Sequence, residues 1–230
     1  MQKKNSSICY LISACFILCA LLASVHFWSF NLDFYRKQHD SIMLYGKHIS
    51  GYIGFSDEDL ADLTEFTLDY LNDPDASLDR KMEIKGSLRE VYTDDEKLHM
   101  VDVRKLNLAA NCLCMASFVI VVLGIFWMIL KKQPLSDLYK AYSRVLKIIM
   151  IVITVLAVWI VIDFDSFWTA FHHVFFASNE LWILDLRKDI LIMIVPPEFF
   201  NNLVIYIVIT FVILVMAFYL LLHIFGKKSQ

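Results

Sequence analysis

Two of the seven histidines in the sequence lie among residues that would support acid–base chemistry. His99 has Glu96 three residues before it and Asp102 three residues after it, so in a helix both carboxylates share its face. A carboxylate beside an imidazole fixes its tautomer and raises its basicity, which a general base needs. His172 lies in a phenylalanine-rich stretch, and polar contacts strengthen in such apolar surroundings. The two histidines therefore predict a site for proton transfer. The alternative explanation is that His99 lies on a solvated, charged helix face and that His172 belongs to a segment that only anchors the chain at the membrane interface.

The sequence lacks the common motifs for nucleophilic and phosphate chemistry. It contains no Gly-x-Ser-x-Gly, His-Glu-x-x-His or P-loop pattern. All five cysteines fall within long apolar blocks: Cys9, Cys15, Cys19, Cys112 and Cys114. If the protein is an acyl-transfer enzyme, it should therefore act by general acid–base chemistry and form no covalent acyl-enzyme. We also expect it to need no cofactor.

Two rival functions remain open at this point. The first is a metal-dependent membrane hydrolase, with histidines and carboxylates of one segment as ligands: His172, His173, Asp163 and Asp165. The second is a non-enzymatic sensor or accessory protein that binds a partner through an acidic segment.

The histidines lie between apolar blocks that are long enough to cross a membrane. The blocks cover residues 8–30, 108–130, 145–162 and 203–225 in a chain that is 58% hydrophobic. About 20 helical residues cross a hydrocarbon core, so all four blocks qualify. We therefore expect an all-α membrane protein with four transmembrane helices, the first of them a retained span rather than a cleaved signal peptide.

Charge distribution predicts the orientation of these helices. Nine basic residues and one acidic residue flank the blocks on one side, whereas segment 31–107 carries 17 acidic and 10 basic residues and segment 163–201 carries 6 and 2. Basic residues concentrate on the cytoplasmic side of membrane proteins. Both termini are thus expected in the cytoplasm and the acidic segments outside, and this acidity gives no reason to expect a nucleic-acid partner.

Segment 31–107 is expected to form a mainly helical extracellular cap. Ser56 and the acidic residues after it predict a helix that runs to Asn72. Thr93 and Glu96 have the spacing of a capping box, so a second helix should begin there and continue into the second span. Residues 33–48 also favour a helix, whereas 82–91 fit either a strand or a short helix.

Segment 163–201 is unusually aromatic for a loop. Its nine aromatic residues are Phe164, Phe167, Trp168, Phe171, Phe175, Phe176, Trp182, Phe199 and Phe200. Such a segment is typical of a helix that lies at headgroup depth. The chain is therefore divided into 1–30 (N-terminus and first span), 31–107 (cap), 108–162 (second and third spans), 163–201 (interfacial segment) and 202–230 (fourth span and tail).

The two outer segments contain patterns that resemble a known family. They are Glu96-x-x-His99-Met100-x-Asp102-Val103, Asp165-x-Phe167, Phe171-His172-x-x-Phe175-Phe176, Asn179, Trp182, Asp185, Asp189-x-Leu191-Ile192 and Pro196-x-x-Phe199-Phe200. Together they resemble the bacterial lipoprotein intramolecular transacylase (Lit) family. Although position 173 is also histidine, the register of the motif selects His172.

The resemblance implies an enzyme of the bacterial cell membrane that acts on diacylglyceryl-modified lipoproteins at the extracellular face. It implies movement of the sn-2 acyl chain to the α-amino group of the N-terminal cysteine, which gives a lyso-form lipoprotein, and membrane lipid as surroundings. It also implies two catalytic histidines, His99 and His172. The supporting residues would be Asp102, Glu96, Asp165, Asn179, Trp182, Asp185 and Asp189, and the substrate pocket would comprise Phe167, Phe171, Phe175, Phe176, Phe199 and Phe200.

The reaction needs a base for the amine and an acid for the leaving glyceryl oxygen. We assign His99 as the base, oriented by Asp102, and His172 as the acid or oxyanion partner.

Overall fold

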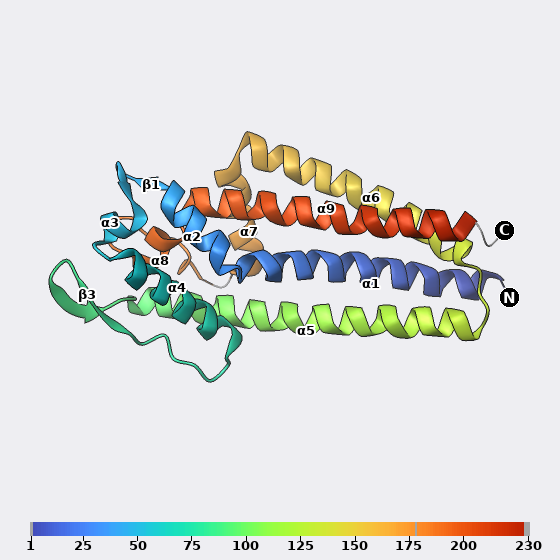
Figure 1. Ribbon diagram of the computed structural model, residues 1–230, viewed down its shortest axis with the longest axis horizontal. Helices are drawn as coiled ribbons and strands as arrows, with labels where there is room; N and C mark the ends of the chain where they lie inside the picture. The colour runs from blue at the N-terminus through green and yellow to red at the C-terminus, as the bar shows by residue number, and fades with distance from the viewer. Residues whose placement is uncertain (1, 178, 228–230) are drawn as a thin grey trace. The chain divides into compact units, whose positions relative to one another are not determined.

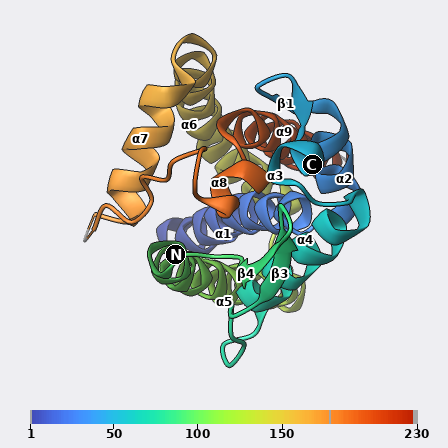
Figure 2. The same cartoon turned by 90° about the vertical axis from the view of Figure 1, so that its left-hand side faces the viewer.

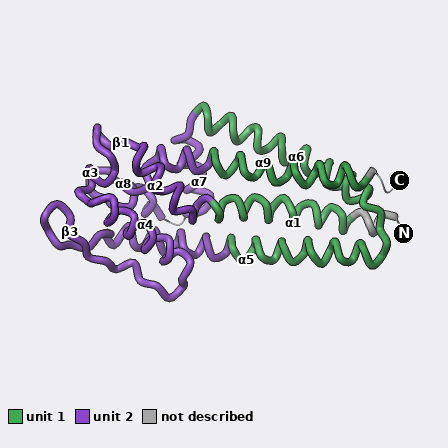
Figure 3. The backbone as a smooth tube through the Cα atoms, viewed as in Figure 1, with its two compact units in different colours: residues 1–27, 110–162, 205–230 green, residues 28–109, 163–204 purple. Residues whose placement is uncertain are grey.

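A computed structural model of the protein describes residues 2–177 and 179–227, which form two compact units. One unit comprises residues 1–27, 110–162 and 205–230, and the other comprises 28–109 and 163–204 (Figure 3). Each unit is thus assembled from segments that are far apart in the sequence.

The first unit is a bundle of apolar helices. It contains most of α1 (Gln2–Ser29), the second part of α5 (Asp94–Leu130), α6 (Leu135–Ile162) and most of α9 (Pro197–Lys227) (Figure 1). These four helices are long and apolar enough to cross a membrane. The prediction of an all-helical membrane protein with four candidate spans is therefore confirmed.

The core of the bundle draws buried side chains from all four helices, including Ile12, Val121, Tyr142 and Phe211. Gly124 on α5 allows close packing there, because a Cβ at this position would lie 2.5 Å from Cγ1 of Ile12. Small residues permit such approaches between membrane helices.

Helix α5 begins with the predicted capping box. The Thr93 N–H donates to the Glu96 carboxylate at 2.6 Å, and the Glu96 N–H donates to the Thr93 hydroxyl at 3.3 Å. The helix then continues to Leu130 without a break, as predicted. Its first sixteen residues, which carry all of its charged residues, belong to the second unit, and the rest of the helix is apolar.

The second unit starts with α2 (Leu32–Ser41), which ends earlier than the sequence favoured. After Ser41 the chain forms a two-residue hairpin, β1 (Met43–Leu44) and β2 (Lys47–His48), instead of a helix to residue 48. Tyr45 and Gly46 in its turn have φ of 49° and 80°, which a helix does not allow. The helix prediction is therefore wrong for residues 42–48.

Two further helices follow in this unit, α3 (Ile49–Ile53) and α4 (Asp57–Asn72). The predicted helix from Ser56 to Asn72 is confirmed, and Ser56 and Asp59 form a reciprocal capping box. Next comes the antiparallel hairpin of β3 (Lys81–Ile84) and β4 (Ser87–Glu90), whose strands lie side by side in Figure 2. The ambiguous stretch 82–91 is therefore mainly strand.

The aromatic segment contributes α7 (Phe164–Phe175) and the short α8 (Ile190–Ile194) to the same unit. The Asp163 side chain accepts from the Ser166 N–H at 3.0 Å and caps α7. Between the two helices the chain is irregular, with turns fixed by side-chain hydrogen bonds such as that from the Leu181 N–H to the Asn179 amide oxygen.

Candidate active site

Helix α7 carries His172 on an aromatic face. Trp168 and His172 are one turn apart, and their ring centroids lie 4.7 Å from each other at 72°. His172 is 6% exposed, whereas His173 points outward and is exposed. The structure therefore buries the histidine that the motif selects.

One hydrogen bond fixes the tautomer of His172. Its Nδ1 lies 2.8 Å from the backbone carbonyl oxygen of Trp168. A carbonyl oxygen only accepts, so Nδ1 carries the hydrogen and donates. In the neutral ring, Nε2 is then an unprotonated acceptor.

His99 approaches His172 from the start of α5. The two ring centroids are 6.2 Å apart, although the residues are 73 positions apart in the sequence. Phe176 contacts both rings, at 5.2 Å from His99 and 5.6 Å from His172. The histidines ranked first from sequence thus lie in one enclosed aromatic cluster.

Burial favours the neutral form of both imidazoles. It lowers the pKa of His99 to about 4, with a further lowering by His172 and a smaller opposing effect of Asp102. Burial also lowers the pKa of His172, against the hydrogen bond to Trp168. Burial disfavours the charged form, so each ring loses its proton at a lower pH than an exposed histidine.

We therefore expect His99 to remain neutral as the pH falls from 8 to about 5, because its midpoint is displaced well below about 6.5, the value of free histidine. The measurement is an NMR titration of the protein labelled at histidine Cε1, with the His99 signal assigned from a His99→Gln variant. A midpoint for His99 at or above about 6.5 would contradict the burial argument.

The Asp102 carboxylate forms hydrogen bonds with Asn179 and Lys105 and does not orient the His99 ring. Its carboxylate accepts from the Asn179 side-chain amide at 3.0 Å and from Lys105 at 3.1 Å. Its effect on His99 is electrostatic, through the modest rise in pKa that it causes. The Asn179 contact joins α5 to the irregular segment after α7.

Glu96 is completely buried and serves the backbone instead of His99. One carboxylate oxygen accepts from the Thr93 N–H at 2.6 Å, and the other accepts from the Leu191 N–H at 2.7 Å. Glu96, which belongs to α5, thus caps the N-terminal end of α8 and joins α8 to the start of α5. Its two oxygens therefore hold backbone N–H groups and do not orient the His99 ring, contrary to what the sequence had led us to expect.

The remaining supporting residues lie in two places. Asp189 is buried and accepts from the Asp185 N–H at 2.7 Å, while Asp185 accepts from the Arg187 N–H at 2.9 Å. These bonds shape the chain that leads into α8. Asp165 is exposed in the first turn of α7, two turns before His172.

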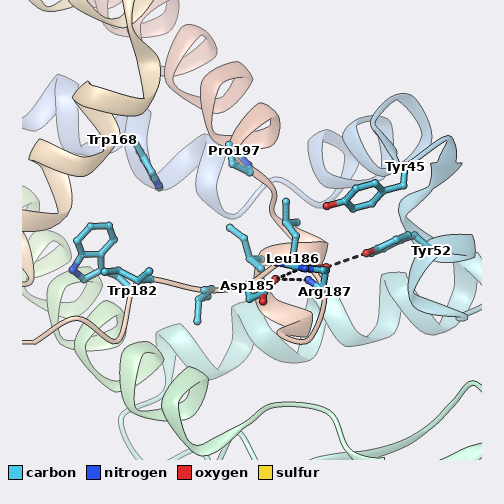
Figure 4. A pocket seen from close by; sticks show the side chains of 11 residues that line it. Tyr45, Tyr52, Trp168, Trp182, Asp185, Leu186, Arg187 and Pro197 are labelled. Carbon is cyan, nitrogen blue, oxygen red and sulfur yellow. Dashed lines mark hydrogen bonds and ion pairs between the residues drawn. The ribbon is translucent and has the colours of Figure 1, made fainter.

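A cavity of about 840 Å³ lies beside this cluster in the same unit. Trp168 and Trp182 form one side of it, and Tyr45 and Tyr52 form another, as Figure 4 shows. Its other lining residues are Ile183, Leu184, Asp185, Leu186, Arg187, Ile192 and Pro197. Both tryptophans also contact His172, so one wall of the cavity adjoins the histidines.

The six phenylalanines expected at the substrate are not among the lining residues of this cavity. Phe171 and Phe176 contact His172 directly, and Phe200 contacts Trp168 with centroids 4.3 Å apart. Phe199 is fully buried and packs against Tyr35 and His39. Phe167 lies against Phe164, and Phe175 against Phe171. Their contact with substrate stays a prediction.

The family of the chain follows from a match over most of its length. The family described as lipoprotein intramolecular transacylase Lit matches residues 10–200. The chain belongs to the Lit family of lipoprotein intramolecular transacylases. No curated protein matches it in sequence.

Solved Lit structures share the fold. The membrane integral lipoprotein intramolecular transacylase Lit from Bacillus cereus gives a TM-score of 0.81 at 20% identity, over 99% of this chain and 98% of that one. Two structures of the Bacillus cereus protein with one histidine replaced, by arginine or by alanine, give TM-scores of 0.72 and 0.74 at 19% identity. They cover 100% and 99% of this chain, and 96% of the other chain in each case.

The four residues that would bind the metal of the rival hydrolase do not come together in this Lit chain. Within residues 2–177 and 179–227, no group of three or more histidine, cysteine, aspartate or glutamate side chains is placed to hold a metal ion. Asp163 is occupied in capping α7, His172 is buried, and His173 faces outward beside Trp182.

Sequence reasoning missed two parts of the site. The first is the Trp168 carbonyl that orients His172, for which the four-residue spacing was the available signal. The second is the tyrosine side of the cavity, where the Tyr52 hydroxyl donates to the Leu186 carbonyl at 3.2 Å. No local pattern connects Tyr52 with a segment 134 residues away.

Proposed function

We propose that the protein moves the sn-2 acyl chain of a diacylglyceryl lipoprotein to the α-amino group of its N-terminal cysteine, without an acyl-enzyme. The observation that supports this most is the meeting of His99 and His172 at 6.2 Å in an enclosed cluster of a Lit family member. The replaced histidine of the Bacillus cereus structures also suggests that a histidine matters in that protein.

In this proposal His172 is the base, which reverses the assignment favoured from sequence. Its Nδ1–H is bound to the Trp168 carbonyl, so Nε2 is available to take the proton from the attacking amine. The same nitrogen then returns that proton to the glyceryl oxygen as the ester bond breaks. One histidine thus transfers a proton between two groups of a single substrate.

His99 then acts as a hydrogen-bond donor to the substrate, opposite His172. Neutral imidazole has one N–H donor, and this donor can hold the glyceryl oxygen while the proton arrives. A positive charge on His172 disfavours a second positive charge on His99 and lowers its pKa, so the two rings are not both in the imidazolium form. Asp102 and Glu96 join the start of α5, which carries His99, to the segment that follows α7, which carries His172.

The cavity beside the tryptophans is proposed to receive part of the lipoprotein. Its wall combines tryptophan and aliphatic side chains with Asp185 and Arg187, which suits an apolar chain and a polar end. An aromatic enclosure also keeps water from the ester and holds amine and ester close together.

The orientation expected from charge belongs to the proposal as well. With both termini in the cytoplasm, the segments 31–107 and 163–201 form an extracellular cap and an interfacial aromatic segment. The predominance of acidic over basic residues in both segments supports this arrangement. The histidine pair would then act at the outer face of the bacterial membrane.

The test is mass spectrometry of a synthetic diacylglyceryl lipopeptide incubated with the purified protein in lipid. A transacylase leaves the total mass unchanged, and fragmentation shows one acyl chain on the cysteine nitrogen. Loss of a fatty acid, prevented by a strong chelator, would instead indicate the metal-dependent hydrolase. An unmodified lipopeptide would favour the sensor or accessory protein.

A further inference from the structure

The indole N–H of Trp182 is a buried donor that has no acceptor within the described part of the chain. The only other buried side-chain nitrogen or oxygen in this condition there is Nδ1 of His99. Buried polar groups in folded proteins are nearly always hydrogen-bonded, because an unpaired one loses its contacts with water and gains nothing in return. Two such atoms in one cluster therefore point to a ligand.

The contacts of Trp182 place this donor next to the proposed base. Its ring stacks on His172 with centroids 4.7 Å apart and an angle of 28°. His173 packs against it at 5.4 Å and 82°, so neighbouring rings hold the indole from two directions. In Figure 4 the indole nitrogen lies on the side of the ring that faces away from Tyr45 and Tyr52.

The backbone on both sides of Trp182 is also fixed. The Leu181 N–H donates to the Asn179 side chain at 3.1 Å, and the Ile183 N–H donates to the Glu180 carbonyl at 3.0 Å. A donor held in this way needs little reorganisation when charge develops nearby, which is the property of an oxyanion site.

Other polar groups near the cluster are already used or point elsewhere. The Asn179 amide donates to Asp102, and the His172 Nδ1–H donates to the Trp168 carbonyl. The Arg187 side chain is 81% exposed. The indole N–H is donor only and carries no competing acceptor.

We propose that Trp182 is a catalytic residue whose indole N–H binds the carbonyl oxygen of the scissile ester as it becomes an oxyanion. This inference rests on the proposed function. As the amine nitrogen bonds to the carbonyl carbon, the C=O π electrons move to the oxygen, and the indole N–H stabilises that charge. When the C=O re-forms, the bond to the glyceryl oxygen breaks, and that oxygen receives from His172 the proton that the amine gave up.

Both unpaired atoms are covered by side chains, so the side chains over them must move to admit a substrate, while Trp182 keeps its stacking on His172. The donor and the base then act on different atoms of the same ester–amine pair. The stacking of Trp182 on His172 sets the spacing between them.

The experiment replaces only the N–H of Trp182. A variant with benzothienylalanine at position 182 keeps a bicyclic ring that stacks on His172 but has sulfur in place of N–H. We expect kcat for lyso-form production to fall by about 100-fold or more, as for the loss of other oxyanion donors, with KM nearly unchanged. Trp182→Phe should show the same loss of kcat.

The control is Trp127→Phe on the membrane part of α5, outside the unit that holds the histidines. It should keep wild-type kcat and KM. Wild-type kcat in the benzothienylalanine variant would overturn the role of Trp182 and leave the proposed function intact. A wild-type protein that forms no lyso-form would overturn both, and a change in KM alone would assign Trp182 to binding and refute the oxyanion role.

Discussion

Replacing His172 by alanine is expected to lower the rate of lyso-form production by about 10²–10⁴-fold, the usual contribution of a general acid–base group. The reason is that His172 Nε2 is the acceptor that the Trp168 hydrogen bond leaves available beside His99. Without it, the amine proton has no defined route to the glyceryl oxygen. His99→Ala should reduce the rate as well, by removing the second imidazole.

The measurement is initial rate with the diacylglyceryl lipopeptide, at several pH values and with protein of verified folding. His48→Ala is the matched control, because His48 is exposed in β2 of the same unit and does not line the cavity. It should keep the wild-type rate. Full activity in His172→Ala would remove that residue from the mechanism, and full activity in His99→Ala would do so for His99.

Replacing Glu96 by alanine is expected to lower the free energy of unfolding by about 2–5 kcal/mol. Glu96 is fully buried, and its two oxygens accept from the Thr93 and Leu191 N–H groups. Alanine would leave both donors without partners and would disconnect α8 from the start of α5. The loss of stability should therefore exceed that of an ordinary helix cap.

Thermal or denaturant unfolding of the protein in detergent measures this change. Glu96→Gln should have an intermediate effect, because its amide oxygen can accept from one N–H while its NH₂ faces the other. Glu58→Ala serves as the control, since Glu58 is an exposed acid in the first turn of α4. Equal stability of Glu96→Ala and the wild type would show that α8 does not depend on this bond.

The local features of the fold follow directly from the sequence. The helix start at Ser56 and the capping box at Thr93 appear where the sequence predicts them, because the hydrogen bonds of both caps join residues only three apart. The four apolar helices follow from length and hydropathy, since a backbone in lipid must satisfy its own hydrogen bonds. The end of α2 at Ser41 was missed because a two-residue turn depends on φ at Tyr45 and Gly46, not on apolar periodicity.

The geometry of the candidate site, in contrast, depends on tertiary packing. Sequence selected His99 and His172 as residues for proton transfer, but their separation of 6.2 Å depends on how α5 and α7 pack. The role of Glu96 changed for the same reason: its partner Leu191 is 95 residues away, beyond the reach of any helical spacing rule. Burial, which sets the neutral state of His99, likewise comes from side chains of several segments.

The sequence by itself thus determined four apolar helices, two capped helix starts and the pair of histidines that could transfer protons. These depend on covalent order and on interactions within one or two turns. Only the tertiary structure decided that His172 rather than His173 is buried, that its Nδ1 is bound to Trp168 and that the Trp182 N–H is left unpaired beside it. Each of these depends on which side chains meet across segments, and a linear pattern does not encode such contacts.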